Sequence, residues 1–260
     1  KGAIGSNKIL FTTYTRALMT ASRQLLEQLL TPEQRKCVRV ATCDEIAREI
    51  VASGRKLGTM EAGSTNIEIL RAVRKVFIPS GPTGFDQKLR AQVLNKLTDR
   101  YLLEEFEWII EGRGINSLKE YIAAPRPGRG YSLKEGVRET IWDLHKAFID
   151  EVSKRKLERF SLIRSEALAL VRNGQWKDRY DFVLIDEAQD LPPSAISLMA
   201  ELARTEEGIF FAADNKQSLY SRNYSWSVVH PRLQFKGRTA VLKRNYRSTA
   251  ENDKAAFEIL

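Results

Sequence analysis

The first and last parts of the chain alternate short apolar runs with stretches of helical spacing. Residues 16–30 place leucines on one helical face after Thr15, a candidate N-cap, and residues 44–51 predict another helix. Five apolar runs have strand length: residues 9–14, 38–43, 182–185, 209–213 and 239–242. Because strands and helices alternate, we predict an α/β fold in which a parallel sheet carries helices on both faces.

The middle of the chain differs, because its apolar positions follow helical spacing and no run matches those strands. Gly- and Pro-rich stretches at residues 79–84 and 125–130 interrupt the helical pattern. We therefore predict three parts. They are the first part of the α/β domain at residues 1–54, a mainly helical insertion at residues 55–172, and the second part of the same domain at residues 173–260.

Two helix starts are expected in the last part. The Pro-Pro-Ser run at residues 192–194 suits a first helical turn, with Asp190 as its expected cap. Ser248 and Glu251 have capping-box spacing before a last helix.

Composition adds an expectation about partners. The 260 residues are 43% hydrophobic and 29% charged, which is an ordinary globular balance. The net charge is +9, which favours a polyanionic partner, with nucleic acid first and a membrane surface second. No run approaches the roughly 20 apolar residues of a membrane span, and no N-terminal signal pattern is present.

Cysteine usage points to a reducing compartment. Cys37 and Cys43 are the two cysteines of the chain, and we place both in one predicted strand, about 20 Å apart along it. That separation is too long for a disulfide. With two cysteines and two histidines no zinc pattern can be assembled. Because the cysteines are predicted to be unpaired, we expect a reducing, cytoplasmic compartment. Because no apolar run is long enough to span a membrane, we expect no membrane partner.

The strongest chemical signal is the sequence Tyr-Asp-Phe-Val-Leu-Ile-Asp-Glu-Ala-Gln-Asp at residues 180–190. A predicted buried strand ends there in Asp186 and Glu187, and open α/β sheets bind ligands at the carboxyl ends of their strands. Asp186 suits Mg²⁺, and Glu187 suits the base that activates a water for phosphoryl transfer. An acidic helix entry is the alternative, but it explains Asp190 better than the adjacent pair.

Two further segments follow strands. Residues 214–220 read Asp-Asn-Lys-Gln-Ser-Leu-Tyr, in which Gln217 suits contact with a γ-phosphate. Residues 242–248 read Leu-Lys-Arg-Asn-Tyr-Arg-Ser, in which Arg247 suits charge stabilisation and Tyr246 suits stacking on a nucleobase. Taken alone, aromatic side chains after a strand also suit core packing, and a basic strand end also suits solvent.

Together the three segments resemble the Asp-Glu-x-x-Asp, Gly-Asp-x-x-Gln-Ser-Ile-Tyr and Asn-Tyr-Arg-Ser motifs of UvrD/Rep-type superfamily 1 DNA helicases. Residues 11–18, Phe-Thr-Thr-Tyr-Thr-Arg-Ala-Leu, resemble the first DNA-contacting motif of that family. Residues 40–44 lie where its next motif belongs, with Cys43 and Asp44 in place of Phe-His. Ala213 replaces a usual glycine, and Arg222 stands where some members have tryptophan.

The resemblance implies a first RecA-like motor domain with a helical insertion, and ATP and Mg²⁺ as cofactors. It implies that Asp186 holds Mg²⁺, Glu187 is the base, Gln217 and Arg247 contact the γ-phosphate, and Tyr246 stacks on adenine. It also implies a track for single-stranded DNA, with these residues along it: Thr13, Tyr14, Arg16, Thr42 and Tyr220.

The expected activity is ATP-dependent translocation on single-stranded DNA, 3′ to 5′, with a cleft that closes against a second RecA-like domain. That domain is not in the residues given, so this chain alone is not expected to unwind DNA. The alternatives are a non-hydrolysing DNA-binding or docking module on the same fold, and the motor part of a helicase–nuclease.

The start of the chain suggests a phosphate loop. Gly2, Gly5 and Ser6 fit the opening of the family's Gly-x-x-Gly-Ser-Gly-Lys-Thr loop, and the match stops before the Gly-Lys-Thr. Because a parallel crossover needs about 10 residues or more, we expect a missing segment between Ser6 and Asn7. A remnant of cloning is the alternative.

The stretch Pro-Arg-Pro-Gly-Arg-Gly at residues 125–130 is a further candidate for a phosphate contact. A solvated turn is the alternative interpretation.

Overall fold

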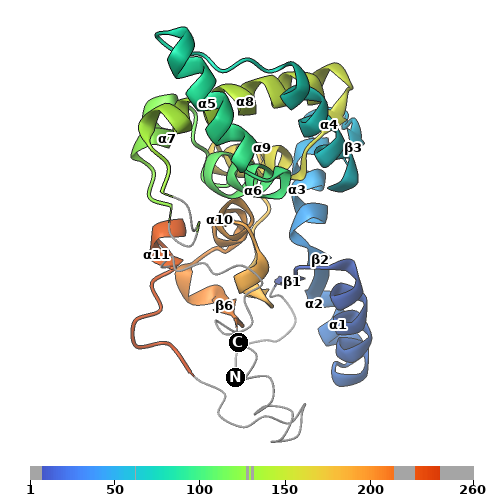
Figure 1. Cartoon of the computed structure of the whole chain (residues 1–260). Coiled ribbons are helices and arrows are strands. Elements are labelled where there is room, and N and C mark those ends of the chain that lie inside the picture. Colours follow the sequence, from blue (N-terminus) through green and yellow to red (C-terminus); the bar gives the residue numbers. More distant parts are fainter. Residues whose placement is uncertain (1–7, 62, 127–128, 130–131, 214–225, 241–260) are drawn as a thin grey trace, which may run out of the picture.

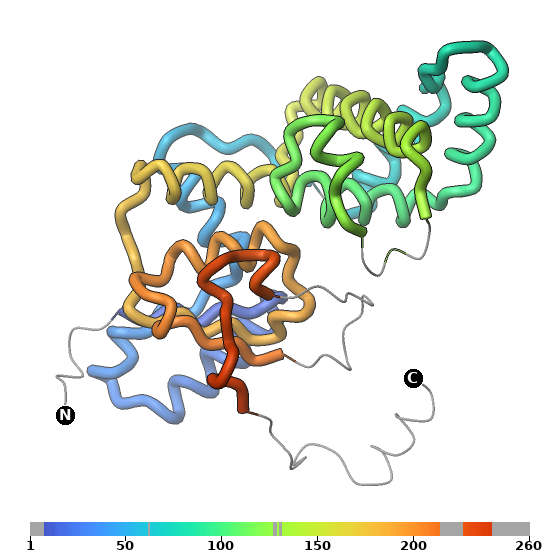
Figure 2. Tube along the Cα trace, turned by 90° about the vertical axis from the view of Figure 1, so that its left-hand side faces the viewer, coloured from blue at the N-terminus to red at the C-terminus, as the bar shows by residue number. Residues whose placement is uncertain are grey.

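The computed structural model describes residues 8–61, 63–126, 129, 132–213 and 226–240. These residues form an α/β part around a parallel sheet and a helical part beside it (Figure 1). A view from the side shows the helices of the second part standing to one side of the sheet (Figure 2).

The sheet formed by the described residues has four parallel strands in the order β2-β1-β5-β6. Their bounds are Ile9–Thr13 for β1, Val38–Thr42 for β2, Phe182–Ile185 for β5 and Ile209–Phe211 for β6. The register pairs Thr13 with Thr42 and Thr12 with Ile185, so these strands end at the same edge. The predicted parallel α/β sheet is confirmed.

Helices cover both faces of this sheet, as predicted. Their bounds are Arg16–Leu29 (α1), Pro32–Cys37 (α2), Cys43–Ala52 (α3), Phe160–Arg172 (α9), Pro193–Leu202 (α10) and Trp226–Val229 (α11). Two 3₁₀ turns add Ala188–Asp190 (η2) and Glu206–Gly208 (η3). Because β–α–β crossovers are right-handed, α1 lies on one face and α3, α9 and α10 lie on the other.

The core of the α/β part lies between the sheet and those three helices. Leu10, Val183 and Ile185 of the sheet are buried there against α3, α9 and α10. Three buried side chains of α9 belong to this core, namely Ile163, Ala167 and Val171. By its packing, α9 therefore lies with the sheet, although residues 55–172 are predicted as one insertion.

The placement of both cysteines in one strand is wrong. Cys37 ends α2 and Cys43 begins α3, and both are free thiols. Capping decides this, because Thr42 accepts the backbone N–H of Glu45 while the Glu45 carboxylate accepts the N–H of Thr42. Burial raises the pKa of the Cys43 thiol.

Other boundaries also differ from the predicted ones. Thr15 caps α1 as expected, and β1 ends at Thr13 instead of residue 14. Asp190 does not cap α10, because it ends a 3₁₀ turn and the cap position belongs to Pro192. Strand β6 ends at Phe211 instead of residue 213. The segment predicted as a strand at residues 239–242 has no strand at 239–240, and its remainder, like Ser248 and Glu251, lies outside the described residues.

The helical part is built from helices, as predicted, with one small sheet in addition. Its helices are Gly63–Val76 (α4), Gly84–Lys96 (α5), Asp99–Glu104 (α6), the π-helix Glu105–Glu111 (η1), Leu118–Ala123 (α7) and Glu135–Lys154 (α8). Strands Thr59–Met60 (β3) and Leu157–Glu158 (β4) pair in parallel, which was not predicted. A second core unites these helices, with Phe106, Tyr121 and Phe148 among its fully buried residues.

The π-helix of this part carries two buried glutamates with complete sets of partners. Glu105 is fully buried, and its carboxylate accepts hydrogen bonds from Arg126 at 2.5 Å, Arg129 at 2.9 Å and the Tyr121 hydroxyl at 2.8 Å. Burial alone would raise the pKa of Glu105, but Arg126 and Arg129 outweigh it and lower the pKa.

The other buried glutamate, Glu111, joins the π-helix to the neighbouring elements. Its carboxylate contacts His145 at 2.9 Å and Arg159 at 3.0 Å, and it accepts a hydrogen bond from the Ser161 hydroxyl. Arg159 also reaches Glu61 at 3.2 Å. Burial acts to raise the pKa of Glu111, but Arg159, His145 and Ser161 lower it to about 2.

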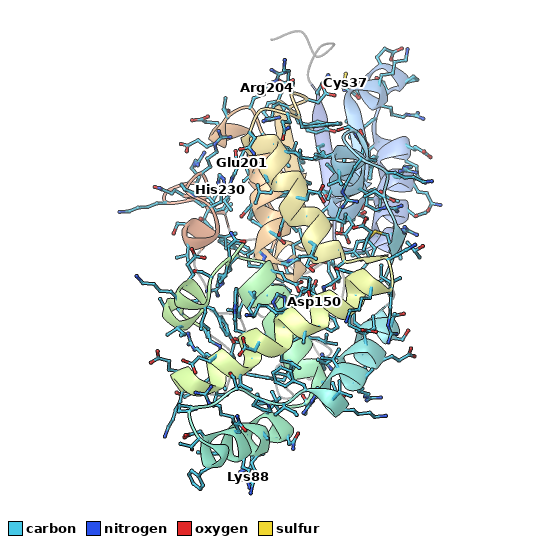
Figure 3. All side chains as sticks on the ribbon, turned by 90° about the horizontal axis from the view of Figure 1, so that it is seen from above. Cys37, Lys88, Asp150, Glu201, Arg204 and His230 are labelled. Atoms are coloured by element: carbon cyan, nitrogen blue, oxygen red, sulfur yellow. The ribbon has the colours of Figure 1, made fainter. Side chains whose placement is uncertain are left out.

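A pair between a buried histidine and a half-buried glutamate fixes the chain that follows α11. The ring of His230 lies 3.1 Å from the Glu201 carboxylate of α10, and both side chains can be followed in Figure 3.

Of the helices within the described ranges, none has the length and apolar composition that crossing a bilayer requires.

Candidate functional site

The acidic pair predicted from the sequence lies at the carboxyl end of β5. The backbone N–H of Asp186 donates to the carbonyl of Thr12 at 2.9 Å, which extends the pairing of β5 with β1 by one residue. The N–H of Ala188 donates to the carbonyl of Ala212 at 3.1 Å, just beyond β6. The turn that carries Asp186 and Glu187 is therefore held from both sides by neighbouring strands.

Glu187 adopts an unusual backbone conformation. Its φ of 52° and ψ of 42° lie in the left-handed region, which among non-glycine residues is rare and costs about 1–3 kcal/mol. Its own N–H donates to the Asp186 carboxylate at 3.1 Å, which helps to hold the turn. Such strain clusters at functional sites, and here it turns a half-buried carboxylate at the edge of the sheet.

The side chain of Gln189 fixes the direction of that carboxylate. Its amide Nε2 donates to Oε2 of Glu187 at 2.6 Å, and Gln189 itself is buried. The sequence pattern alone predicts no role for Gln189. The available signal was an amide that follows an acidic pair, but its contact with Glu187 depends on the left-handed turn.

The end of β1 and the segment after it supply two accessible side chains and one buried side chain from the predicted DNA track. Tyr14 is 40% exposed and Arg16 is exposed, whereas Thr13 is fully buried. Thr42, at the end of β2, is also buried, and its hydroxyl accepts the N–H of Glu45 at 3.2 Å. Tyr14 and Arg16 are therefore the accessible ones among these four side chains.

A hollow of about 240 Å³ brings part of the predicted DNA track together. Tyr14, Arg16 and Thr42 all line it, so it lies at the carboxyl ends of β1 and β2. Because β5 pairs with β1 in parallel register, Asp186 ends its strand at this same edge of the sheet. Acidic and basic candidates therefore share one edge.

Three other residues named from the sequence have partners within the protein. Arg126 and Arg129, in the candidate phosphate-contact stretch, are largely buried and paired with Glu105, so the structure contradicts that interpretation and also the solvated turn. Asp44, where the family has histidine, forms an ion pair with the buried Arg164 at 2.6 Å.

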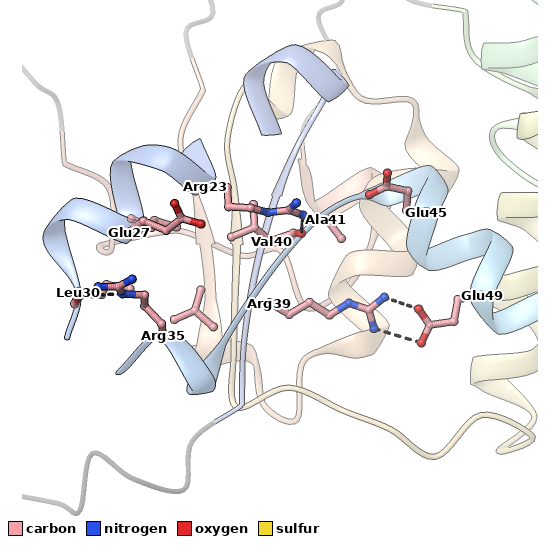
Figure 4. Close-up of a pocket in the computed structure, with 11 residues that line it drawn as sticks. Arg23, Glu27, Leu30, Arg35, Arg39, Val40, Ala41, Glu45 and Glu49 are labelled. Carbon is pink, nitrogen blue, oxygen red and sulfur yellow. Dashed lines mark hydrogen bonds and ion pairs between the residues drawn. The ribbon is translucent and has the colours of Figure 1, made fainter. Parts of the chain in front are cut away.

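A larger hollow of about 560 Å³ lies between α1, α2, β2 and α3 (Figure 4). Its arginines already have partners. Arg39 forms an ion pair with Glu49, Arg23 donates to the carbonyl of Val40 at 3.1 Å, and Arg35 donates to the carbonyl of Leu30 at 3.1 Å. These contacts leave none of the three arginines without an acceptor.

The implied Mg²⁺ fits the acidic edge. Nucleotide-bound Mg²⁺ takes one or two carboxylates and completes its shell with phosphate and water oxygens, and Asp186 is a half-buried carboxylate at a strand end. Within the described ranges, no group of three or more His, Cys, Asp or Glu residues can hold a metal by itself.

The remaining predicted residues lie outside the described part: Gly2, Gly5, Ser6, Gln217, Tyr220, Tyr246 and Arg247. The junction between Ser6 and Asn7 lies there as well.

Comparisons with known proteins found similarity over most of the chain. The family model described as UvrD/REP helicase N-terminal domain matches residues 1–226. A stretch of 78 residues, 29% of this chain, is 33% identical to a Bacillus subtilis (strain 168) protein named "Putative ATP-dependent DNA helicase YjcD". The matched stretch covers 10% of that protein's length.

Proposed function

Because this chain belongs to the UvrD/REP helicase N-terminal domain family, we propose that it is part of an ATP-driven translocase that moves 3′ to 5′ on single-stranded DNA. One observation carries the proposal: the acidic turn of β5 and the hollow lined by Tyr14 and Arg16 lie at the same edge of one parallel sheet. In this arrangement nucleotide and nucleic acid bind next to each other on a shared rigid element.

In the proposed reaction Glu187 removes a proton from the water that attacks the γ-phosphate. Asp186 would hold Mg²⁺, which supplies neutralisation of phosphate charge when bound. Gln189 positions Glu187, since its amide donates to the carboxylate oxygen at 2.6 Å. The left-handed turn keeps that carboxylate at the sheet edge before nucleotide binds.

The other assigned residues complete the site by family resemblance. Gln217 and Arg247 would contact the γ-phosphate, and Tyr246 would stack on adenine. Gly2, Gly5 and Ser6 would open the phosphate loop, and Thr13, Thr42 and Tyr220 would join Tyr14 and Arg16 along the DNA. A second RecA-like domain would close the cleft.

The proposed division of the chain keeps a RecA-like domain interrupted by a helical insertion. The buried contacts of α9 with the sheet favour an insertion that ends before Phe160, with α9 returning to the RecA-like part. In this division Arg159 stands at the boundary, where it joins the π-helix to the first residues of α9.

The proposal is tested by Glu187→Gln in a full-length protein that carries this domain. The variant keeps the shape of the side chain and loses the base, so it should bind ATP and hydrolyse it about 100-fold more slowly, or slower still. Steady-state hydrolysis and nucleotide binding are measured on the same preparation. Glu206→Gln, an exposed glutamate at the start of η3, is the matched control and should turn over like the unmodified protein.

Near-normal turnover by Glu187→Gln would remove Glu187 from the role of base. A full-length protein that binds single-stranded DNA and never hydrolyses ATP would instead support the docking-module alternative.

A further inference from the structure

The 240 Å³ hollow is lined by more than the predicted DNA residues. Arg48 of α3 and Phe160, the first residue of α9, also line it. Residues 48 and 160 come from opposite sides of the helical insertion, so folding joins two distant segments next to Tyr14 and Arg16. The hollow is smaller than pockets that enclose a whole small ligand, about 300 Å³ and above, and suits one unit of a longer chain.

The guanidinium groups of the two arginines that line the hollow form no hydrogen bond or ion pair with the described part of the chain. Arg16 is exposed, and Arg48 is half-buried, with its Nε atom inaccessible to solvent and without a hydrogen bond. A guanidinium nitrogen that is removed from water without a partner is costly, about 1–3 kcal/mol or more. The terminal nitrogens of Arg48 are not among the buried atoms without a partner, and Arg48 lines the hollow, so an anion seated there can contact those nitrogens.

The carboxylates of the hollow are already engaged. Asp44 is paired with Arg164 at 2.6 Å, and Arg164 is itself buried. Glu45 accepts the backbone N–H of Thr42 at 3.1 Å, in the first turn of α3, where the helix dipole favours a negative charge. The charge left for a ligand is therefore that of Arg16 and Arg48.

Aromatic rings lie beside these cations. Tyr14 is 40% exposed and Phe160 is half-buried on the lining of the same hollow. Cations that follow a phosphate chain together with aromatic faces for bases are the combination that binds single strands without sequence preference. A folded duplex offers its bases only at groove edges, so unpaired nucleotides fit this lining better.

We propose that Arg48 and Phe160 belong to the single-strand binding site: Arg48 contacts a backbone phosphate, and Phe160 stacks on a neighbouring base. This inference rests on the proposed function, since it extends a DNA track that begins with Tyr14 and Arg16. It adds α3 and the start of α9 to that track, on both sides of the insertion.

The test uses the purified chain and a fluorescein-labelled oligothymidine of about 16 nucleotides, titrated by fluorescence anisotropy at several salt concentrations. Arg48→Gln should weaken binding about 5-fold at about 0.1 M salt and reduce the slope of log K against log salt by about 0.7, the effect of one lost phosphate contact. Arg204→Gln is the matched control. It removes the same charge from a surface pair with Asp181 at the opposite end of the sheet, and the slope should stay unchanged.

Phe160→Leu tests the stacking role separately. Leucine keeps an apolar side chain at the start of α9 and removes the aromatic face. Binding should weaken at least about 5-fold, the lower end of the effect of one lost base stack, with no change in salt slope. Circular dichroism checks that both variants fold like the parent chain.

The outcomes separate the two proposals. If Arg16→Gln weakens binding while Arg48→Gln and Phe160→Leu bind like the unmodified chain, the extension is overturned and the DNA track stands. If the unmodified chain shows no salt-dependent binding of oligothymidine, both proposals are overturned.

Discussion

In the helical part, the buried guanidinium of Arg159 lies between the carboxylates of Glu111 and Glu61. At the carboxyl edge of the sheet, Arg48 has a solvent-inaccessible nitrogen that no described residue accepts from. Each region contains a guanidinium nitrogen that is removed from water. In the helical part described carboxylates accept its hydrogen bonds, whereas the nitrogen of Arg48 has no such acceptor among the described residues. Arg126 and Arg129 follow the pattern of Arg159, because both contact Glu105.

This difference indicates which charges hold the fold and which are available to a ligand. A buried ion pair is costly to desolvate, and removing one partner is more costly still, so a complete set of contacts is a structural requirement. A polar group left without a partner at a strand end instead indicates a ligand. Two hydroxyls there, those of Thr12 and Thr13, are also buried without a hydrogen bond among the described residues.

The largest expected effect comes from removing the buried cation that Glu111 and Glu61 share. Arg159→Met keeps an unbranched apolar stem and leaves Glu111 and Glu61 buried without their shared cation, so it should lower the free energy of unfolding by about 3–5 kcal/mol. Urea denaturation measures this. Arg155→Met, which breaks an exposed pair with Glu151, is the control and should cost at most about 1 kcal/mol.

Equal losses in Arg159→Met and Arg155→Met would contradict the view that the buried network stabilises the joint between the two parts. The two regions would then differ in the geometry of their arginine contacts and not in what those contacts contribute to stability.

A smaller effect concerns acid stability. The pKa of Glu111 lies at about 2 in the folded protein, below its usual range, because Arg159, His145 and Ser161 outweigh the effect of burial. A lowered folded pKa gives stability that is present above the unfolded pKa of about 4.3 and is lost as pH falls towards 2. The contribution is on the order of 3 kcal/mol.

Urea denaturation at a series of pH values between about 7 and 2 tests this prediction. The unmodified chain should lose stability steeply below about pH 5, and Glu111→Gln should show a shallower decline from a lower starting value. The same slope in both proteins would assign the acid sensitivity to other carboxylates.

Local signals explain how much of the fold could be predicted from sequence. An apolar run between Asp181 and Asp186 fixed the bounds of β5 correctly, and Thr15 marked the start of α1. The apolar run at residues 38–43 predicts a strand that includes Cys43, whereas the capping box of Thr42 and Glu45 starts α3 at Cys43.

Long-range contacts explain most of what could not be predicted. The sequence around Arg126 reads as a loop with exposed charge, but its partner Glu105 lies on another helix whose burial no local pattern reveals. In the same way, the contact of Gln189 with Glu187 requires a left-handed turn, and Arg48 and Phe160 line one hollow although they are far apart in the sequence.

The smallest expected effect concerns the stability of the chain after substitution of Arg48, with and without nucleic acid. Arg48→Gln should lower the free energy of unfolding by no more than about 0.5 kcal/mol in the absence of nucleic acid, because no described partner is lost. It should even gain stability if the cost of the unpaired nitrogen is relieved. With oligothymidine at about ten times its Kd, the unmodified chain should gain about 1.4 kcal/mol, and Arg48→Gln at that same concentration should gain less because its Kd is higher. Urea denaturation with and without the oligonucleotide measures both quantities. A large loss of stability in free Arg48→Gln would mean that Arg48 supports the fold as Arg159 does, and the distinction between the two regions would fail.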